Sequence, residues 1–90
     1  MTTVADILHF IEGIAPPALK MEWDNIGLLC GRQDKTVHTV LVALDPFTHV
    51  CEEAVEVGAD LLITHHPLIL EPLSAVTDQT TIGQSVIRLI

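Results

Sequence analysis

The sequence predicts an α/β fold with a mixed or parallel sheet, a βαβ unit and helices packed on the sheet. Two apolar stretches, residues 36–45 and 61–64, have the composition of strands, and a helical pattern over 48–58 separates them. Strand, helix and strand within about 30 residues make a βαβ unit, whose right-handed crossover requires parallel strands. With 90 residues and 49% apolar content, we expect one α/β domain over 1–90, a fragment of a longer protein.

The N-terminal third is predicted to contain one helix and one short strand. Residues 3–14 carry apolar side chains at helical spacing, and Thr3 with Asp6 forms a variant capping box. A loop over 18–25 follows, and apolar residues 26–30 are expected to form a strand.

The remaining elements follow from changes in hydrophobic pattern. Residues 36–45 alternate at first and then become continuously apolar, which is typical of a strand in a sheet covered on both faces. After the helix and the strand of the βαβ unit, residues 68–79 read as a loop. A final helix opens at Thr80 or Thr81 and keeps helical spacing to Ile90 without a stop signal, which indicates truncation.

Charge and cysteine content narrow the possible partners and compartment. The formal charge is −8 with four Lys and Arg residues, so no basic patch can form, and we expect no nucleic-acid and no membrane partner. No apolar run approaches the ~20 residues that span a bilayer, and no signal peptide is visible. Cys30 and Cys51 are expected to be small buried thiols without a disulfide framework, which favours the cytoplasm.

Asp45, His65 and His66 are the strongest candidates for chemistry. Asp45 ends one predicted strand, and the adjacent histidines end the other. The carboxyl ends of parallel strands share the edge where α/β sheets bind ligands. Because neighbouring strand residues point to opposite faces, the pair suits two ions better than one. Imidazole with carboxylate favours zinc, iron, nickel, cobalt or manganese; the alternative is that these groups only cap or pack.

A second candidate segment lies earlier in the chain. Asp24 and Asn25 beside Trp23 are either turn formers or part of a loop whose indole and amide border a pocket. The other histidines (His9, His38 and His49) are expected to have ordinary structural or solvated roles.

Three segments, EWDNIGLLCG at 22–31, ALD at 43–45 and GADLLITHHPL at 58–68, together resemble the type-two GTP cyclohydrolase I family, also called Nif-three-like dinuclear metal-centre proteins. The resemblance implies an α/β fold, two divalent metal ions per complete site, and homo-oligomers in the form of dimer-based, hexameric rings. It also implies that His65 and His66 are metal ligands, and that the remaining ligands lie beyond Ile90.

The resemblance leaves two functions open. One is a metal-dependent hydrolase that opens a nucleotide-type ring, such as the imidazole ring of guanine in GTP, in the intact parent, with Asp45 orienting a ligand or a water. The other is a non-catalytic interaction or regulatory module with an incomplete metal site or none. We expect the 90-residue form to be inactive alone.

Overall fold

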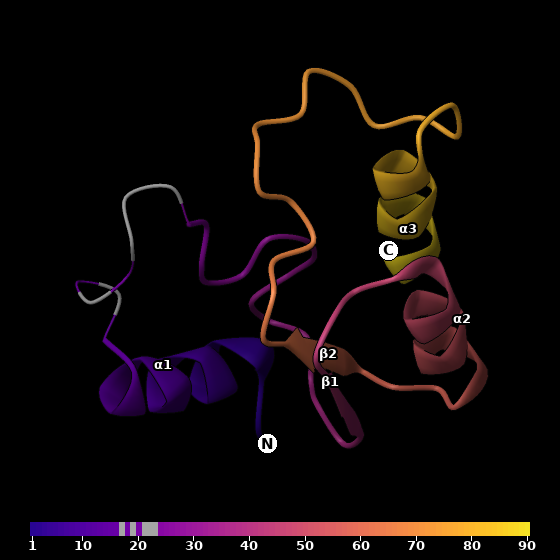
Figure 1. Cartoon of the computed structure of the whole chain (residues 1–90). Coiled ribbons are helices and arrows are strands. Elements are labelled where there is room, and N and C mark those ends of the chain that lie inside the picture. The colour runs from indigo at the N-terminus through magenta and orange to yellow at the C-terminus, as the bar shows by residue number, and fades with distance from the viewer. Residues whose placement is uncertain (17, 19, 21–23) are drawn as a thin grey trace.

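The computed structural model describes residues 1–16, 18, 20 and 24–90. Helices and strands alternate along these residues (Figure 1), as α1 Val4–Ile14, β1 Val40–Ala43, α2 Thr48–Glu56, β2 Leu61–Thr64 and α3 Thr81–Leu89. β1 and β2 pair in parallel, with Val40 opposite Leu61 and Ala43 opposite Thr64. The predicted α/β fold and its parallel βαβ unit are therefore confirmed.

The sheet is narrow and only partly covered. It has two strands in the described part of the chain, so each strand has one edge without a partner strand there. Val40 and Val42, which lie two residues apart in β1 and so share a face of the sheet, are 39% and 70% exposed. This face of β1 is therefore left open by the described residues.

Both hydrogen bonds of a capping box form at the N-terminus of helix α1. The Thr3 N–H donates to Asp6 Oδ2 at 2.9 Å, and the Asp6 N–H donates to Thr3 Oγ1 at 3.3 Å, as the sequence predicted. The next two amides, of Val4 and Ala5, donate to the carbonyls of Lys35 and Gln33. The turn before β1 thus accepts the N–H groups that the first turn of a helix leaves without intrahelical partners.

The predicted strand over residues 26–30 is wrong, because this segment is irregular in the structure. Gly27 and Gly31 adopt positive φ angles of 96° and 107°. Such angles suit glycine and interrupt extended geometry. The apolar side chains of this segment instead line a cavity described below.

The predicted strand over 36–45 is shorter in the structure, where β1 covers only Val40–Ala43. Thr36 forms an isolated antiparallel bridge with Thr3. The backbone amides of His38 and Thr39 donate to the Asp60 carboxylate instead of to a neighbouring strand. For these two amides the Asp60 side chain therefore takes the place of a partner strand.

Helices α2 and α3 pack against each other beside the sheet (Figure 1). Cys51 and Ala54 of α2 and Val86 of α3 are buried. Cys51 is the free, fully buried thiol that the sequence predicted, whereas Cys30 is free but only partly buried. Burial raises the pKa of the Cys30 thiol above its usual value. Helix α2 begins after Phe47, whose side chain makes no capping hydrogen bond.

The three named helices are short, with 11 residues in α1 and nine each in α2 and α3. Within the described residues, none has the length and apolar character that crossing a membrane requires.

Asp60 joins the start of β1 to the start of β2. Its Oδ2 accepts the N–H groups of His38 and Thr39 at 2.9 and 3.1 Å, and its Oδ1 lies 4.0 Å from Lys35 Nζ. The two amides, and to a smaller extent the Lys35 charge, hold the pKa of Asp60 below its usual value.

A carboxyl with a lowered pKa makes stability depend on pH. The contribution of Asp60 is complete above the ordinary pKa of aspartate, about 3.9, and is lost as the pH falls through the lower folded value. We expect Asp60→Asn to flatten the fall in unfolding free energy between neutral and acid pH, measured by urea denaturation at several pH values. Glu71→Gln is the control and should keep the wild-type slope; an unchanged slope in Asp60→Asn would contradict this role.

Candidate metal centre

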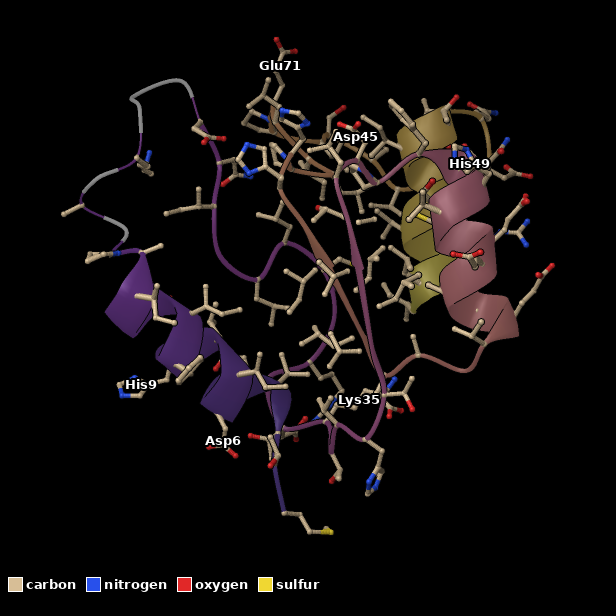
Figure 2. The ribbon with its side chains drawn as sticks, turned by 60° about the horizontal axis from the view of Figure 1, so that its bottom comes forward. Asp6, His9, Lys35, Asp45, His49 and Glu71 are labelled. Atoms are coloured by element: carbon tan, nitrogen blue, oxygen red, sulfur yellow. The ribbon has the colours of Figure 1, made fainter. Side chains whose placement is uncertain are left out.

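The sheet brings the ends of β1 and β2 together at one edge. Beyond the strands the ladder continues, since the His65 N–H donates to the Ala43 carbonyl at 3.3 Å and the His66 N–H to the Leu44 carbonyl at 3.0 Å. Asp45 and the histidine pair therefore lie side by side at the carboxyl edge. In Figure 2 this edge lies at the top, with Asp45 and His49, opposite Asp6 and Lys35.

Asp45 holds one of the two histidines by a direct side-chain contact. His66 Nδ1 lies 2.5 Å from Asp45 Oδ1. A carboxylate can only accept a hydrogen bond, so Nδ1 donates and carries the ring proton. In the neutral imidazole the lone pair then lies on Nε2, which is the arrangement that carboxylates impose on metal-binding histidines. The His66 side chain is 56% exposed, so an ion from solvent can reach it.

The two imidazoles lie close together but border different spaces. Their ring centroids are 4.9 Å apart, and the ring planes meet at 68°. His65 lines a cavity of about 430 Å³, whereas His66 lines a second hollow together with Asp45 and His49. Neighbouring strand residues point to opposite faces, and the pair keeps this divergence where the strand ends.

Thr64 adds a contact that the sequence did not reveal. Its hydroxyl donates to the carbonyl of His66 at 2.6 Å and so restrains the turn that carries both rings. The available signal was a threonine directly before the pair, since Ser and Thr side chains often bond to backbone groups a few residues away.

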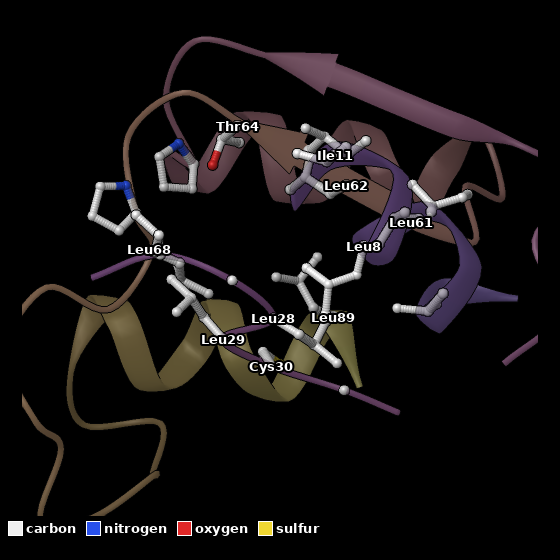
Figure 3. A pocket seen from close by; sticks show the side chains of 18 of the residues that line it. Leu8, Ile11, Leu28, Leu29, Cys30, Leu61, Leu62, Thr64, Leu68 and Leu89 are labelled. Carbon is white, nitrogen blue, oxygen red and sulfur yellow. The ribbon is translucent and has the colours of Figure 1, made fainter. Parts of the chain in front are cut away.

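The 430 Å³ cavity lies between α1, the irregular segment 24–31 and β2 (Figure 3). Most of its lining is aliphatic, contributed by Leu8 and Ile11 of α1 and by Leu61 and Leu62 of β2. Polar groups line it too, among them His65 and Asn25. A mostly apolar cavity with a few polar groups is the usual form of a small-molecule site.

Asp24 and Asn25 are held beside the loop that follows the histidines. The Asn25 amide donates from Nδ2 to the carbonyl of Ile69 at 2.7 Å, and the Asn25 N–H donates to Asp24 Oδ1 at 2.8 Å. Both residues line the same cavity as His65. Trp23, the third residue predicted near the site, lies outside the described residues.

The side chains at this edge are of the kinds that bind metal ions, but there are too few of them for a complete ligand set. Imidazole and carboxylate are ligands for zinc and its neighbours. Among the described residues, however, no three His, Cys, Asp or Glu side chains gather closely enough to hold an ion. With Asp45 bonded to His66 Nδ1, the described chain offers two imidazoles, which is part of a ligand set.

Fold and site together define an α/β protein in which a parallel βαβ unit carries paired histidines and an aspartate at its carboxyl edge. A family model matches residues 2–90, and the chain belongs to the Duf34/NIF3 (NGG1p interacting factor 3) family. This agrees with the resemblance drawn from the sequence segments.

Individual relatives agree with this assignment in sequence and in structure. A "GTP cyclohydrolase 1 type 2 homolog" of Clostridium perfringens is 45% identical over 85 residues, which are 94% of this chain and 32% of that protein. A Bacillus cereus protein related to NIF3 has a TM-score of 0.88 at 38% identity, over 98% of this chain and 24% of its own. A Staphylococcus aureus protein has a TM-score of 0.90 at 34% identity, over 98% of this chain and 28% of its own. The chain thus spans about a third of the length of the first curated relatives that it matches.

Proposed function

We propose that this chain supplies two histidine ligands, His65 and His66, to a divalent metal centre. The observation that carries the proposal is the hydrogen bond between Asp45 and His66 Nδ1, because it leaves Nε2 free to bind an ion. The position of both rings at the carboxyl edge of parallel strands supports it as well.

Four residues of the chain have a part in this proposed centre. His65 and His66 bind, Asp45 keeps the proton of His66 on Nδ1, and Thr64 restrains the turn through the His66 carbonyl. When bound, divalent ions activate water for attack on an electrophilic carbon. A complete site needs further ligands, because no three His, Cys, Asp or Glu side chains gather closely enough among the described residues.

For the intact protein we propose hydrolysis of a nucleotide-type ring. Curated relatives bear the name "GTP cyclohydrolase 1 type 2 homolog", and the cavity beside His65 has a volume within the range typical of small-molecule sites. Since the chain spans only 32% of the Clostridium perfringens relative, ring hydrolysis is proposed for the whole protein and metal binding for the chain. The two free thiols support a cytoplasmic location.

A second candidate is a non-catalytic interaction module. It is favoured by the lack of a three-donor group among the described residues. The candidates differ in one measurable respect, because only the first requires the purified chain to take up a divalent ion through the histidine pair.

We expect Asp45→Asn to weaken metal binding by about 10–100-fold, the usual effect of removing a group that orients a metal-binding histidine. Asparagine keeps the size of the side chain but removes the charge that favours the Nδ1 proton. The measurement is Co²⁺ titration of the 90-residue chain, followed by calorimetry and visible absorption.

Asp34→Asn is the matched control for this experiment. It makes the same charge change at an exposed ion pair with Arg32. Lys35, the next residue along the chain, lies at the end of the molecule opposite Asp45 (Figure 2). It should leave Co²⁺ affinity near the wild-type value. Equal affinities for wild type, Asp45→Asn and Asp34→Asn would exclude Asp45 from the centre.

A further inference from the structure

One hydrogen bond holds the loop that follows the histidine pair. Among the described residues, segment 67–76 makes a single hydrogen bond, which the Ile69 carbonyl accepts from Asn25 Nδ2 at 2.7 Å. The two residues are 44 positions apart. Asn25 therefore makes the one hydrogen bond that ties this loop to the rest of the described residues.

Asn25 is itself held in place. Its backbone N–H donates to Asp24 Oδ1 at 2.8 Å, and Lys20 Nζ donates to the Asp24 carbonyl at 3.3 Å. The Asn25 side chain is partly buried. An amide with a fixed backbone in a partly buried position is a stiffer anchor than an exposed, mobile one.

The anchored loop begins at the histidines. The strand ladder holds the backbone amides of His65 and His66, and the Thr64 hydroxyl holds the His66 carbonyl. Only Pro67 and Leu68 then separate His66 from the carbonyl that Asn25 binds. Asn25, His65 and Leu68 also line the same cavity, and Figure 3 shows Thr64 and Leu68 together at one end of it.

We propose that Asn25 is a positioning residue for the histidine pair, acting through the Ile69 carbonyl. The strand fixes one side of the turn and Asn25 fixes the other, so the imidazoles are held for a divalent ion before it arrives. The part of this inference that concerns the ion rests on the proposed metal centre. The part that concerns the orientation of the rings stands on the metal-free geometry.

The chain offers a matched pair of variants for the test. Asn25→Asp keeps the side-chain size, removes the donor and places a carboxylate oxygen against the Ile69 carbonyl. Gln84→Glu does the same at the other amide-to-carbonyl bond, in which Gln84 Nε2 donates to the Asp78 carbonyl at 2.8 Å. Both variants add one negative charge, which by itself attracts a cation, so weaker binding in Asn25→Asp cannot arise from charge.

The experiment has two readouts on the 90-residue chain. The first is Co²⁺ affinity by calorimetry, which we expect to fall about tenfold in Asn25→Asp, at the lower end of the effect of ligand-orienting groups. The second is the ¹⁵N NMR signals of the histidine rings without metal, and those of His65 and His66 should shift in Asn25→Asp. Gln84→Glu should change neither readout. If circular dichroism shows that Asn25→Asp does not fold, Asn25→Ala takes its place.

Wild-type affinity and wild-type ring signals in the Asn25 variant would overturn the positioning role. If the wild-type chain binds no Co²⁺, the proposed metal centre fails for this chain. The ring signals then still decide the role of Asn25: a shift specific to Asn25→Asp supports it, and no shift overturns it.

Discussion

Replacing His65 and His66 together with alanine is expected to abolish Co²⁺ binding by the chain. The two imidazoles are the proposed ligands at the sheet edge, where Asp45 is bonded to His66 Nδ1. Asp45 and His49 remain beside the substituted pair, but among the described residues no three His, Cys, Asp or Glu side chains gather closely enough to hold an ion. Calorimetry and the visible absorption of Co²⁺ measure the loss.

The matched control removes two imidazoles from elsewhere. His9 is exposed on α1, and the hydrogen bond of His38 to Asp60 uses the backbone amide. The double variant His9→Ala with His38→Ala should therefore bind Co²⁺ as the wild type does. Both double variants should keep the wild-type circular dichroism spectrum, because none of the four side chains is buried. Co²⁺ retained at wild-type stoichiometry after loss of the His65–His66 pair would place the metal elsewhere.

The largest expected effect on stability comes from Gly83→Ala. Gly83 is buried in the first turn of α3. A Cβ added there would overlap the backbone carbonyl oxygen of Thr77 and lie 2.8 Å from Thr80 Oγ1, the atom that accepts the Gly83 N–H and caps the helix. Because the Thr77 obstacle is backbone, no side-chain rotation relieves the clash.

We expect a loss of about 3 kcal/mol, at the upper end of the usual cost of overpacking. For a domain of this size that corresponds to a fall in melting temperature of about 12–24 °C, measured by circular dichroism. Gly13→Ala is the matched control. Gly13 lies in α1 with no other atom near its added Cβ, so alanine should stabilise the helix by up to about 1 kcal/mol. Equal melting temperatures for the two variants would contradict this account of Gly83.

The fold could be predicted from the sequence wherever local pattern and tertiary structure agree. The capping box at Thr3 and the helical spacing of α1 are local signals, and the parallel pairing of β1 with β2 follows from the order of elements. The error at residues 26–30 has a physical cause. An apolar run satisfies a strand pattern, but Gly27 and Gly31 turn the backbone so that the same side chains line a cavity.

The site could be predicted only in part, for a similar reason. Topology places Asp45 and the histidines at one edge of the sheet, and that much is visible in the sequence. The choice of His66 over His65 as the partner of Asp45, and the bond from Asn25 to Ile69, depend on rotamers and on contacts between distant residues. No spacing rule reports such contacts.

The Asp60 carboxylate, at the start of the strands, affects which histidine meets Asp45 at their carboxyl ends. Its Oδ2 accepts the N–H groups of His38 and Thr39. These hydrogen bonds restrain the register in which β1 pairs with β2. A slide of one position would turn every following side chain to the reverse side and present His65 to Asp45 in place of His66. The contact that Asp60 makes where the two strands begin thus favours the register that brings His66, and not His65, to Asp45.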